Sequence, residues 1–408
     1  MSDTQVLAAP LELPCGKTLK NRFFKSSMSE ILGTVDHQVS KGLVTLYKQW
    51  AEGECGVLVT GNVMVDRNSL GEPRNVVFDE RTDVSKAAKW ASAATGNNTD
   101  CWVQLNHPGK QSPKAINPDP VSPSAVPLGK GLEQFFNPPR ALSESEIQSI
   151  INKFAFAAKM SKDAGFTGVQ IHGAHGYLVS QFLSPHHNRR DDQWGGSIEN
   201  RMRFVKEIYL AIRKEVGESF PIGIKLNSAD FQRGGFTEED STEVILALDE
   251  LGMDLFEVSG GNYEAPAMTG AKQSTRDREA YFIEFAAKMK TLIKAPIVVT
   301  GGFRSTEGMV EAVGSGEVDM VGIARPLTLQ PDLPKQILEG KNPKSLVKPL
   351  TTGIKALDKA GMLEITWYEQ QMARLAKGKK PNPEMNVYLS ILRTLTSNGV
   401  QAFQKRRA

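Results

Sequence analysis

Short apolar runs alternate with longer stretches of helical periodicity from about residue 20 onward. Most of these runs end in Gly, His, Asn or Ser, and each is followed by a plausible helix. Strands that are apolar over their whole length are buried on both faces, as parallel strands covered by helices are. We count eight such runs, at residues 21–28, 57–65, 101–107, 168–174, 222–228, 255–261, 297–302 and 318–325. The pattern therefore predicts eight consecutive β-α units.

Eight β-α units favour an α/β fold of the (β/α)8 type, a TIM barrel, which we expect over residues 1–340. An open doubly wound sheet would also show the alternation, but no GxGxxG opens the first helix, and eight units is the number that closes a barrel. The helix that follows the third run shows how clear the signals are. Ser143 and Glu146 form a capping-box pattern at its start, and Gly165 ends it.

Residues 108–142 interrupt the rhythm after the third strand. The segment is dense in Pro, Gly and Ser, and its helical signals are weak. A loop of this length inside a compact domain is usually a binding element or a lid. Its place after a barrel strand predicts that it covers the C-terminal mouth, where barrel enzymes hold their active sites.

Beyond Gly340 the β-α rhythm ends, and we expect residues 341–408 to form a helical C-terminal extension. Leu363 and Trp367 are among the side chains that are too apolar for a solvated tail. The extension is therefore expected to pack on the barrel or on a partner subunit. In the second case Trp367–Arg374 would reach a neighbouring subunit and the protein would be a homo-oligomer.

Composition narrows the class of protein only slightly. The 49 basic and 46 acidic residues leave a formal charge of +3, which is too small for a nucleic-acid footprint. Three widely spaced cysteines suggest neither a disulfide framework nor a metal cluster. The first residues lack the basic flank and apolar core of a secretory signal, and no apolar run approaches the ~20 residues that span a bilayer. We expect a cytoplasmic protein with neither membrane nor nucleic acid as partner.

Polar residues and glycines collect at the C-terminal ends of the predicted strands, which all meet at one mouth of a barrel. In chain order they are Ser29; Gly61 and Asn62; Gln104, Asn106 and His107; His172 and His175; Lys225 and Asn227; Ser259 to Asn262; Gly301 and Gly302; Ala324 and Arg325. We expect the active site among them.

Two groups in this set suggest a phosphorylated ligand with a flat ring. Gly301 and Gly302 would let backbone N–H groups approach a phosphate that Arg325 can pair with, and loops after the seventh and eighth strands are the usual phosphate cradle. Gln104 can donate and accept hydrogen bonds together, and Lys225 is a cation on an otherwise apolar strand. The alternative for Lys225 is a structural ion pair with a carboxylate.

Four of the six histidines lie within residues 171–197. His172 and His175 end the fourth strand and, with Tyr177, form a donor cluster that could polarise an oxygen and supply a proton. A zinc site formed with His186 and His187 is the alternative. The sequence offers no carboxylate or cysteine at a recognised metal spacing, so we expect no metal and interpret His186 and His187 as part of a structural loop.

Four segments resemble the old yellow enzyme family of FMN-dependent NAD(P)H oxidoreductases, the NADH:flavin oxidoreductase / NADH oxidase family. They are LKNRFFKSSMS, VQLNHPGKQS, GVQIHGAHGYLVSQFLSPHHNRRDDQWGGSIENRMRF and DMVGIARPL, in the family's order and at similar spacing. The resemblance covers roughly residues 5–340. It implies a (β/α)8 barrel that holds FMN at its mouth and uses NADH or NADPH as reductant.

The resemblance also implies roles for individual residues. His172 and His175 match the pair that binds the electron-withdrawing group of the substrate, Tyr177 matches the proton donor, and Ile31 falls where some members place a substrate-contacting Tyr. The implied FMN-binding positions are Ser26, Met28, Ser29, Gly61, Gln104, His172, Lys225, Gly302, Ala324 and Arg325.

Three of these positions depart from the family's common residues. Ser29 stands where members more often carry Thr or Cys, and Lys225 stands where many have Arg, which is the residue for bidentate contacts. Ile31 in place of Tyr would make the pocket more apolar.

The implied activity is that of an ene-reductase acting on a small activated alkene. Flavin N5 would deliver hydride to the β carbon of an α,β-unsaturated carbonyl or nitro compound, and Tyr177 would protonate the α carbon. One alternative is an NADH oxidase that passes electrons to oxygen or quinones, and another is a committed biosynthetic reductase or isomerase. The chain lacks the cysteine-rich iron–sulfur segment of larger relatives, which argues against a dienoyl-CoA reductase of that type.

Overall fold

Eight parallel strands form a closed barrel in the computed structural model, which describes residues 4–129, 131–265, 282–354 and 362–398. The strands pair in the order β10-β11-β12-β13-β14-β3-β4-β7, and β7 also pairs with β10, which closes the ring. They are β3 (Phe23–Lys25), β4 (Val57–Val59), β7 (Asp100–Asn106), β10 (Gly168–Gly173), β11 (Ile222–Asn227), β12 (Leu255–Ser259), β13 (Ile297–Thr300) and β14 (Met320–Ile323). The predicted (β/α)8 fold is confirmed.

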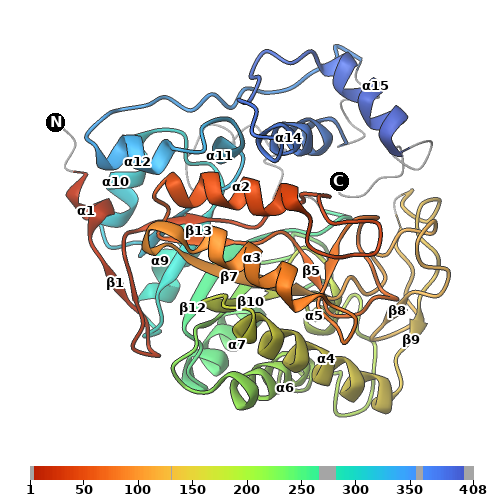
Figure 1. The fold of residues 1–408 in the computed structure, drawn as a ribbon. Helices are drawn as coiled ribbons and strands as arrows, with labels where there is room; N and C mark the ends of the chain where they lie inside the picture. Colours follow the sequence, from red (N-terminus) through yellow and green to blue (C-terminus); the bar gives the residue numbers. More distant parts are fainter. Residues whose placement is uncertain (1–3, 130, 266–281, 355–361, 399–408) are drawn as a thin grey trace.

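Helices surround the barrel, as Figure 1 shows. The capping-box pattern is confirmed, because the Ser143 hydroxyl accepts from the Glu146 N–H at the start of α4 and Glu146 reaches back to Ser143. The outer helices are α2 (Lys41–Glu52), α3 (Val84–Ala94), α4 (Glu144–Asp163), α6 (Ile198–Val216), α7 (Glu238–Glu250), α9 (Ile283–Lys290), α10 (Thr306–Gly314) and α12 (Leu333–Leu338). Shorter helices are α1 (Gln5–Ala8), α5 (Leu178–Leu183), α11 (Pro326–Leu329) and the 3₁₀ turn Gly96–Asn98.

The second predicted strand is interrupted. Residues 57–65 form β4 and then β5 (Val63–Met64), which pairs with the far end of β7 and with β6 (Val76–Val77). The break lies at Gly61, whose N–H donates to the Tyr47 hydroxyl at 3.1 Å instead of to a neighbouring strand. Periodicity alone could not predict this, because the donor's partner comes from α2.

The N-terminal end of the barrel is apolar and covered by an antiparallel hairpin of β1 (Leu11–Glu12) and β2 (Thr18–Leu19). Leu11, Leu13 and Leu19 pack with Phe24 and Trp102 of the barrel in one cluster of buried side chains. We had not predicted the hairpin, because its strands are too short to show a period. It leaves the opposite end of the barrel for the polar residues.

The segment 108–142 packs against residues at that opposite end. It contains the short paired strands β8 (Val121–Ser122) and β9 (Arg140–Ala141). Leu128, Leu132 and Phe136 from this lid segment pack in one cluster with Tyr177 and Tyr263. The lid segment is therefore held by apolar contacts to residues beyond the ends of β10 and β12.

The C-terminal part contains α14 (Met362–Leu375) and α15 (Val387–Asn398). Figure 1 shows α14 lying beside α2, and Met372 and Leu375 of α14 join the main hydrophobic core. Trp367 is buried within this chain, and its Nε1–H donates to the Met385 carbonyl at 2.9 Å. Residues 355–361 and 399–408 of the predicted extension lie outside the described residues. Within the described ranges, no helix combines the length and the apolar character that crossing a bilayer requires.

Candidate active site

The three residues of the predicted donor cluster lie together at the end of β10. The ring centres of His172 and His175 are 5.3 Å apart, and those of His172 and Tyr177 are 4.7 Å apart. His175 has a left-handed backbone with φ of 61°, which turns the chain back from the strand, and Tyr177 precedes the first turn of α5. His172 and Tyr177 are only 2% and 1% exposed. A buried cluster of this kind strengthens any hydrogen bond to a ligand, because water competes little.

Residues at the ends of β11 and β12 orient this cluster. The His175 Nε2 atom lies 2.8 Å from the Ser259 hydroxyl, and the His175 backbone N–H donates to Asn227 Oδ1 at 3.2 Å. The Tyr177 hydroxyl lies 3.0 Å from that of Tyr263. Sequence reasoning placed Ser259 and Asn227 at the mouth but missed Tyr263. Tyr263 could have been predicted, because it directly follows the polar residues that end the sixth run.

The tautomer of His172 follows from its backbone contact. The Nδ1 atom accepts from the Ala174 N–H at 3.3 Å. A neutral ring that accepts at Nδ1 carries its proton on Nε2. His172 is therefore arranged as a donor at Nε2.

A chain of polar side chains crosses the barrel behind the cluster. Gln104 accepts from Ser27 and donates to Gln170, each at 2.8 Å. Gln170 donates in turn to Glu257 at 2.8 Å, and Glu257 pairs with Lys225 at 3.0 Å. Each side chain is hydrogen-bonded or ion-paired to the next, because buried polar groups need such partners. The structural ion pair that we considered for Lys225 is therefore present, and the chain places Lys225 and Gln104 in one network.

Sequence reasoning missed Glu257, although the feature that singled out Lys225 also applies to it. Both are charged residues on otherwise apolar strands, and strand register places them directly opposite each other. Glu257 also accepts from the Thr300 hydroxyl at 2.6 Å, and Thr300 contacts the Ser26 hydroxyl at 2.6 Å. The predicted FMN-binding residue Ser26 thus belongs to the same network.

A second buried ion pair lies behind Gly61, and it too was missed. Lys25 is fully buried, donates to the Val59 carbonyl at 2.7 Å and lies 4.4 Å above the Trp50 ring. Burial lowers the pKa of Lys25 and raises that of Glu30, whose carboxylate is 3.8 Å away. A Cβ at Gly61 would lie 2.8 Å from Glu30 Oε2, so only glycine fits there.

Ser29 and Ile31 follow β3 on the same loop. The Ser29 hydroxyl lies 2.5 Å from Glu72 Oε1 and 2.9 Å from Glu369 Oε1, and its single proton can serve only one of them at a time. Ile31 has φ of 49°, a left-handed conformation that strains a β-branched residue. Met28 is half-buried and packs against the main core. Because Glu369 belongs to α14, the C-terminal part reaches a predicted cofactor-binding residue.

The residues predicted to hold a phosphate lie where β13 and β14 end side by side. Thr300 pairs with Gly322, so Gly301 and Gly302 lie beside the segment that leads to Ala324 and Arg325. Both glycines have positive φ, 112° and 96°, which other residues rarely adopt. Backbone N–H groups freed in this way suit an anionic phosphate. These donors, together with the amide edge of Gln104, fit the phosphate and the flat ring of FMN.

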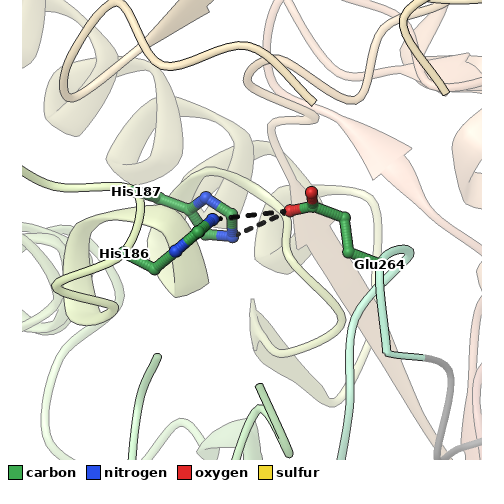
Figure 2. Close-up of side chains that lie close together, drawn as sticks. All are labelled: His186, His187 and Glu264. Carbon is green, nitrogen blue, oxygen red and sulfur yellow. Dashed lines mark ion pairs between the residues drawn. The ribbon is translucent and has the colours of Figure 1, made fainter. Parts of the chain in front are cut away.

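Several polar residues outside the cluster have structural partners. His107 accepts at Nδ1 from the Gly109 N–H at 3.1 Å, and burial lowers its pKa to about 4. Arg190 pairs with Asp192, and the Ser197 hydroxyl accepts from the Asn200 N–H at the start of α6. Figure 2 shows His186 and His187 facing Glu264, with their Nε2 atoms 4.0 Å and 3.9 Å from Glu264 Oε2.

The fold and the mouth residues together describe a (β/α)8 barrel with a buried cluster of His172, His175 and Tyr177 at its mouth. Residues 7–344 match the model of the NADH:flavin oxidoreductase / NADH oxidase family. The chain therefore belongs to this family, as its motifs predicted, and is an FMN-dependent oxidoreductase that uses NADH or NADPH.

Individual relatives agree with this assignment. An NADH-dependent flavin oxidoreductase of Aspergillus parasiticus is 40% identical over 364 residues, 85% of this chain and 81% of the relative. A 2-naphthoyl-CoA reductase complex has a TM-score of 0.77 and 28% identity, over 83% of this chain and 52% of that chain. An old yellow enzyme homologue from Zymomonas mobilis has a TM-score of 0.70 and 23% identity, over 86% and 96% of the two chains. The last comparison shows the same fold.

Proposed function

We propose that the protein reduces the activated C=C bond of α,β-unsaturated carbonyl or nitro compounds. The observation that carries the proposal is the buried cluster of His172, His175 and Tyr177 at the barrel mouth. It combines donors for an oxygen atom with a hydroxyl that can supply a proton. Transfer of electrons to oxygen alone would need neither.

In this reaction the chain binds and polarises the substrate. His172, a donor at Nε2, and His175 would hold the oxygen of the carbonyl or nitro group. Their hydrogen bonds strengthen as negative charge develops on that oxygen, which lowers the barrier. Bound FMN supplies the electrons that NADH or NADPH provides.

Tyr177 would deliver the proton to the α carbon. Its hydroxyl is held by Tyr263 at 3.0 Å, and that hydroxyl can donate to the phenolate that remains after proton transfer. The apolar contacts of Leu128, Leu132 and Phe136 around both tyrosines exclude water from the step. The proton donor is therefore positioned and kept in a dry site.

We further infer a cytoplasmic enzyme with a small-molecule substrate. All three cysteines are free thiols, and two of them, Cys55 and Cys101, are buried. Unpaired thiols are typical of proteins in a reducing compartment. The formal charge of +3 is too small to indicate a nucleic-acid partner.

Anaerobic stopped-flow mixing tests the proposal. NADH-reduced enzyme should be reoxidised by cyclohexenone, maleimide or a nitroalkene, and Tyr177→Phe should slow this step by about 100-fold or more, as loss of a general acid does. Reoxidation by oxygen should stay unchanged in the variant. Tyr388→Phe, an exposed tyrosine of α15, is the matched control and should behave as wild type in both reactions.

Two outcomes would contradict the proposal. Absence of reoxidation across the enone and nitroalkene panel would exclude the activity. If Tyr177→Phe reacted with alkenes and with oxygen at the wild-type rates, electron transfer of the NADH oxidase type would be the better description.

A further inference from the structure

One buried carboxylate is connected to three of the predicted FMN-binding residues. Glu257 of β12 pairs with Lys225 directly, with 3.0 Å between their charged atoms. It is connected to Gln104 and to Ser26 through one intermediate side chain each. The Glu257 side chain is fully buried, so it can act on a bound ligand only through these neighbours.

We propose that Glu257 is a positioning residue for FMN, which sets both the affinity of the site for the cofactor and the reduction potential of the bound flavin. It does so by fixing the hydrogen-bond directions of Gln104 and Ser26 and by offsetting the charge of Lys225. The inference rests on the FMN-binding roles predicted for these three residues and is independent of the alkene reduction proposed above. Because a carboxylate can only accept hydrogen bonds, each side chain bonded to Glu257 has to donate to it.

The connection through Gln170 fixes the orientation of the Gln104 amide. Gln170 donates from Nε2 to Glu257 Oε2 at 2.8 Å, so its Oε1 atom is left to accept. Gln104 Nε2 donates to that oxygen at 2.8 Å, and Gln104 Oε1 therefore accepts from the Ser27 hydroxyl, also at 2.8 Å. Without the carboxylate, both amides could turn over and exchange their donor and acceptor ends. Glu257 thus holds the amide edge of Gln104 in one orientation.

The connection through Thr300 fixes the direction of the Ser26 hydroxyl in the same way. The single hydroxyl proton of Thr300 is donated to Glu257 Oε1 at 2.6 Å. The Ser26 and Thr300 hydroxyls lie 2.6 Å apart, and because the Thr300 proton is already directed at Glu257, Ser26 has to donate. Ser26 therefore keeps only lone pairs for a ligand and acts toward it as an acceptor.

The direct ion pair governs the charge of the site. Lys225 and Glu257 are register partners on β11 and β12, and their side chains are 4% and 0% exposed. The carboxylate therefore offsets the field of the ammonium in surroundings where water screens little. Reduction adds negative charge to a flavin ring, so an ammonium without this partner would favour the reduced form. The pair thus keeps the reduction potential of bound FMN lower than Lys225 alone would.

Glu257→Gln tests both effects in the full-length protein. A glutamine has one acceptor oxygen, so it cannot accept from all three neighbours, and oxidised FMN should bind about fivefold more weakly, as after loss of one hydrogen bond. Because the Lys225 charge is no longer offset, the ratio of the two affinities should shift by at least about tenfold toward reduced FMN. For a two-electron couple this shift raises the reduction potential by about 30 mV. Fluorescence titration with FMN and anaerobic titration of the holoenzyme against a redox dye measure the two quantities.

Asp254→Asn is the matched control. Asp254 directly precedes β12, is 1% exposed and pairs with Arg213 at 2.7 Å. It also accepts from the Cys15 N–H at 2.8 Å, which places it at the end of the barrel that the N-terminal hairpin covers. The control therefore removes a buried carboxylate from an ion pair and should lose stability as Glu257→Gln does. Its FMN affinity and reduction potential should stay at the wild-type values, because the residues of the barrel mouth are unchanged.

Gln170→Met provides a second test that does not require Glu257→Gln to fold. It breaks the connection between Glu257 and Gln104 but keeps the ion pair with Lys225, so FMN should bind about fivefold more weakly without a rise in potential. Thermal unfolding checks that each variant is folded. Wild-type FMN affinity in Gln170→Met, a wild-type potential in Glu257→Gln, or the same changes in Asp254→Asn would each overturn the proposal. The readouts are binding and potential, so the outcome does not depend on alkene reduction.

Discussion

Tyr263 illustrates how a residue outside the family motifs can act on a motif residue. Its hydroxyl lies 3.0 Å from that of Tyr177, and both side chains are almost fully buried. A buried hydroxyl that loses its partner carries the cost of an unsatisfied polar group. Tyr263 therefore positions the proposed proton donor.

Replacement of Tyr263 by Phe should slow alkene reduction by about fivefold, the equivalent of one hydrogen bond of about 1 kcal/mol. Reduction of the flavin by NADH should not change. Stopped-flow measurement of both half-reactions checks this. In the Tyr177→Phe background the second change should have no further effect, because the two residues act through one contact. Additive losses would show that Tyr263 acts independently.

His107 makes stability depend on pH. Burial lowers its pKa in the folded state to about 4, below the ordinary 6.5 of the unfolded chain. Between these values the unfolded state binds more protons, so stability is full above about pH 6.5 and falls as the pH drops. The loss from this residue should reach about 2 kcal/mol at pH 5.

Urea unfolding of wild type and His107→Gln at pH 7.5 and 5.0 measures this contribution. The variant should lose about 2 kcal/mol less than wild type between the two pH values. Equal losses in the two proteins would mean that His107 is not the group that titrates.

At the scale of elements, two neighbouring strands carry opposite charges that form an ion pair. Lys225 of β11 and Glu257 of β12 are register partners, and their charged groups are 3.0 Å apart and almost fully buried. Either strand alone would carry an uncompensated charge in the barrel. The pair therefore makes the register of these two strands specific.

Glu257→Gln should destabilise the protein by about 3–5 kcal/mol, because it leaves the Lys225 ammonium buried without a carboxylate. Glu384→Gln is the matched control. It removes the partner of Lys348 in an ion pair whose side chains are 67% and 80% exposed, and should cost less than about 1 kcal/mol. Denaturant unfolding of both variants gives the comparison, and similar costs would contradict a special role for the buried pair.

At the scale of the whole molecule, the C-terminal part packs on its own barrel. Trp367 is buried, Met372 joins the main core, and Glu369 reaches Ser29 at 2.9 Å. The guanidinium of Arg325, which we predict to hold the FMN phosphate, lies 6.0 Å from the centre of the Tyr368 ring. The sequence left open whether this region packs on its own barrel or on a partner subunit, and these contacts lie within one chain.

Trp367→Ala should lower the stability of α14 packing by about 3–5 kcal/mol, the cost of removing a large buried side chain. Hydrogen exchange across residues 362–375 should become faster, while exchange in the barrel strands stays unchanged. Leu392→Ala, an exposed residue of α15, is the control and should have no effect. Solution scattering should give the same mass for wild type and Trp367→Ala. A lower mass in the variant would mean that Trp367 also supports a contact between subunits.

The sequence by itself determined the elements and the family. Burial on both faces makes parallel strands apolar, so the eight runs identified the barrel strands, and the segment from Gly168 to Phe204 carried the resemblance. Local chemistry was also readable, because caps such as Ser143 act within one helical turn. These features depend on residues close together in the chain.

Only the tertiary structure decided which distant residues meet. Glu257 opposite Lys225, Tyr263 against Tyr177, Glu369 at Ser29 and Glu264 facing His186 and His187 all join separate segments. A single carboxylate or hydroxyl has no periodicity, so its partner is set by strand register and loop packing. The sequence therefore indicated the barrel and its donor cluster, whereas the partners that hold the cluster follow from the fold alone.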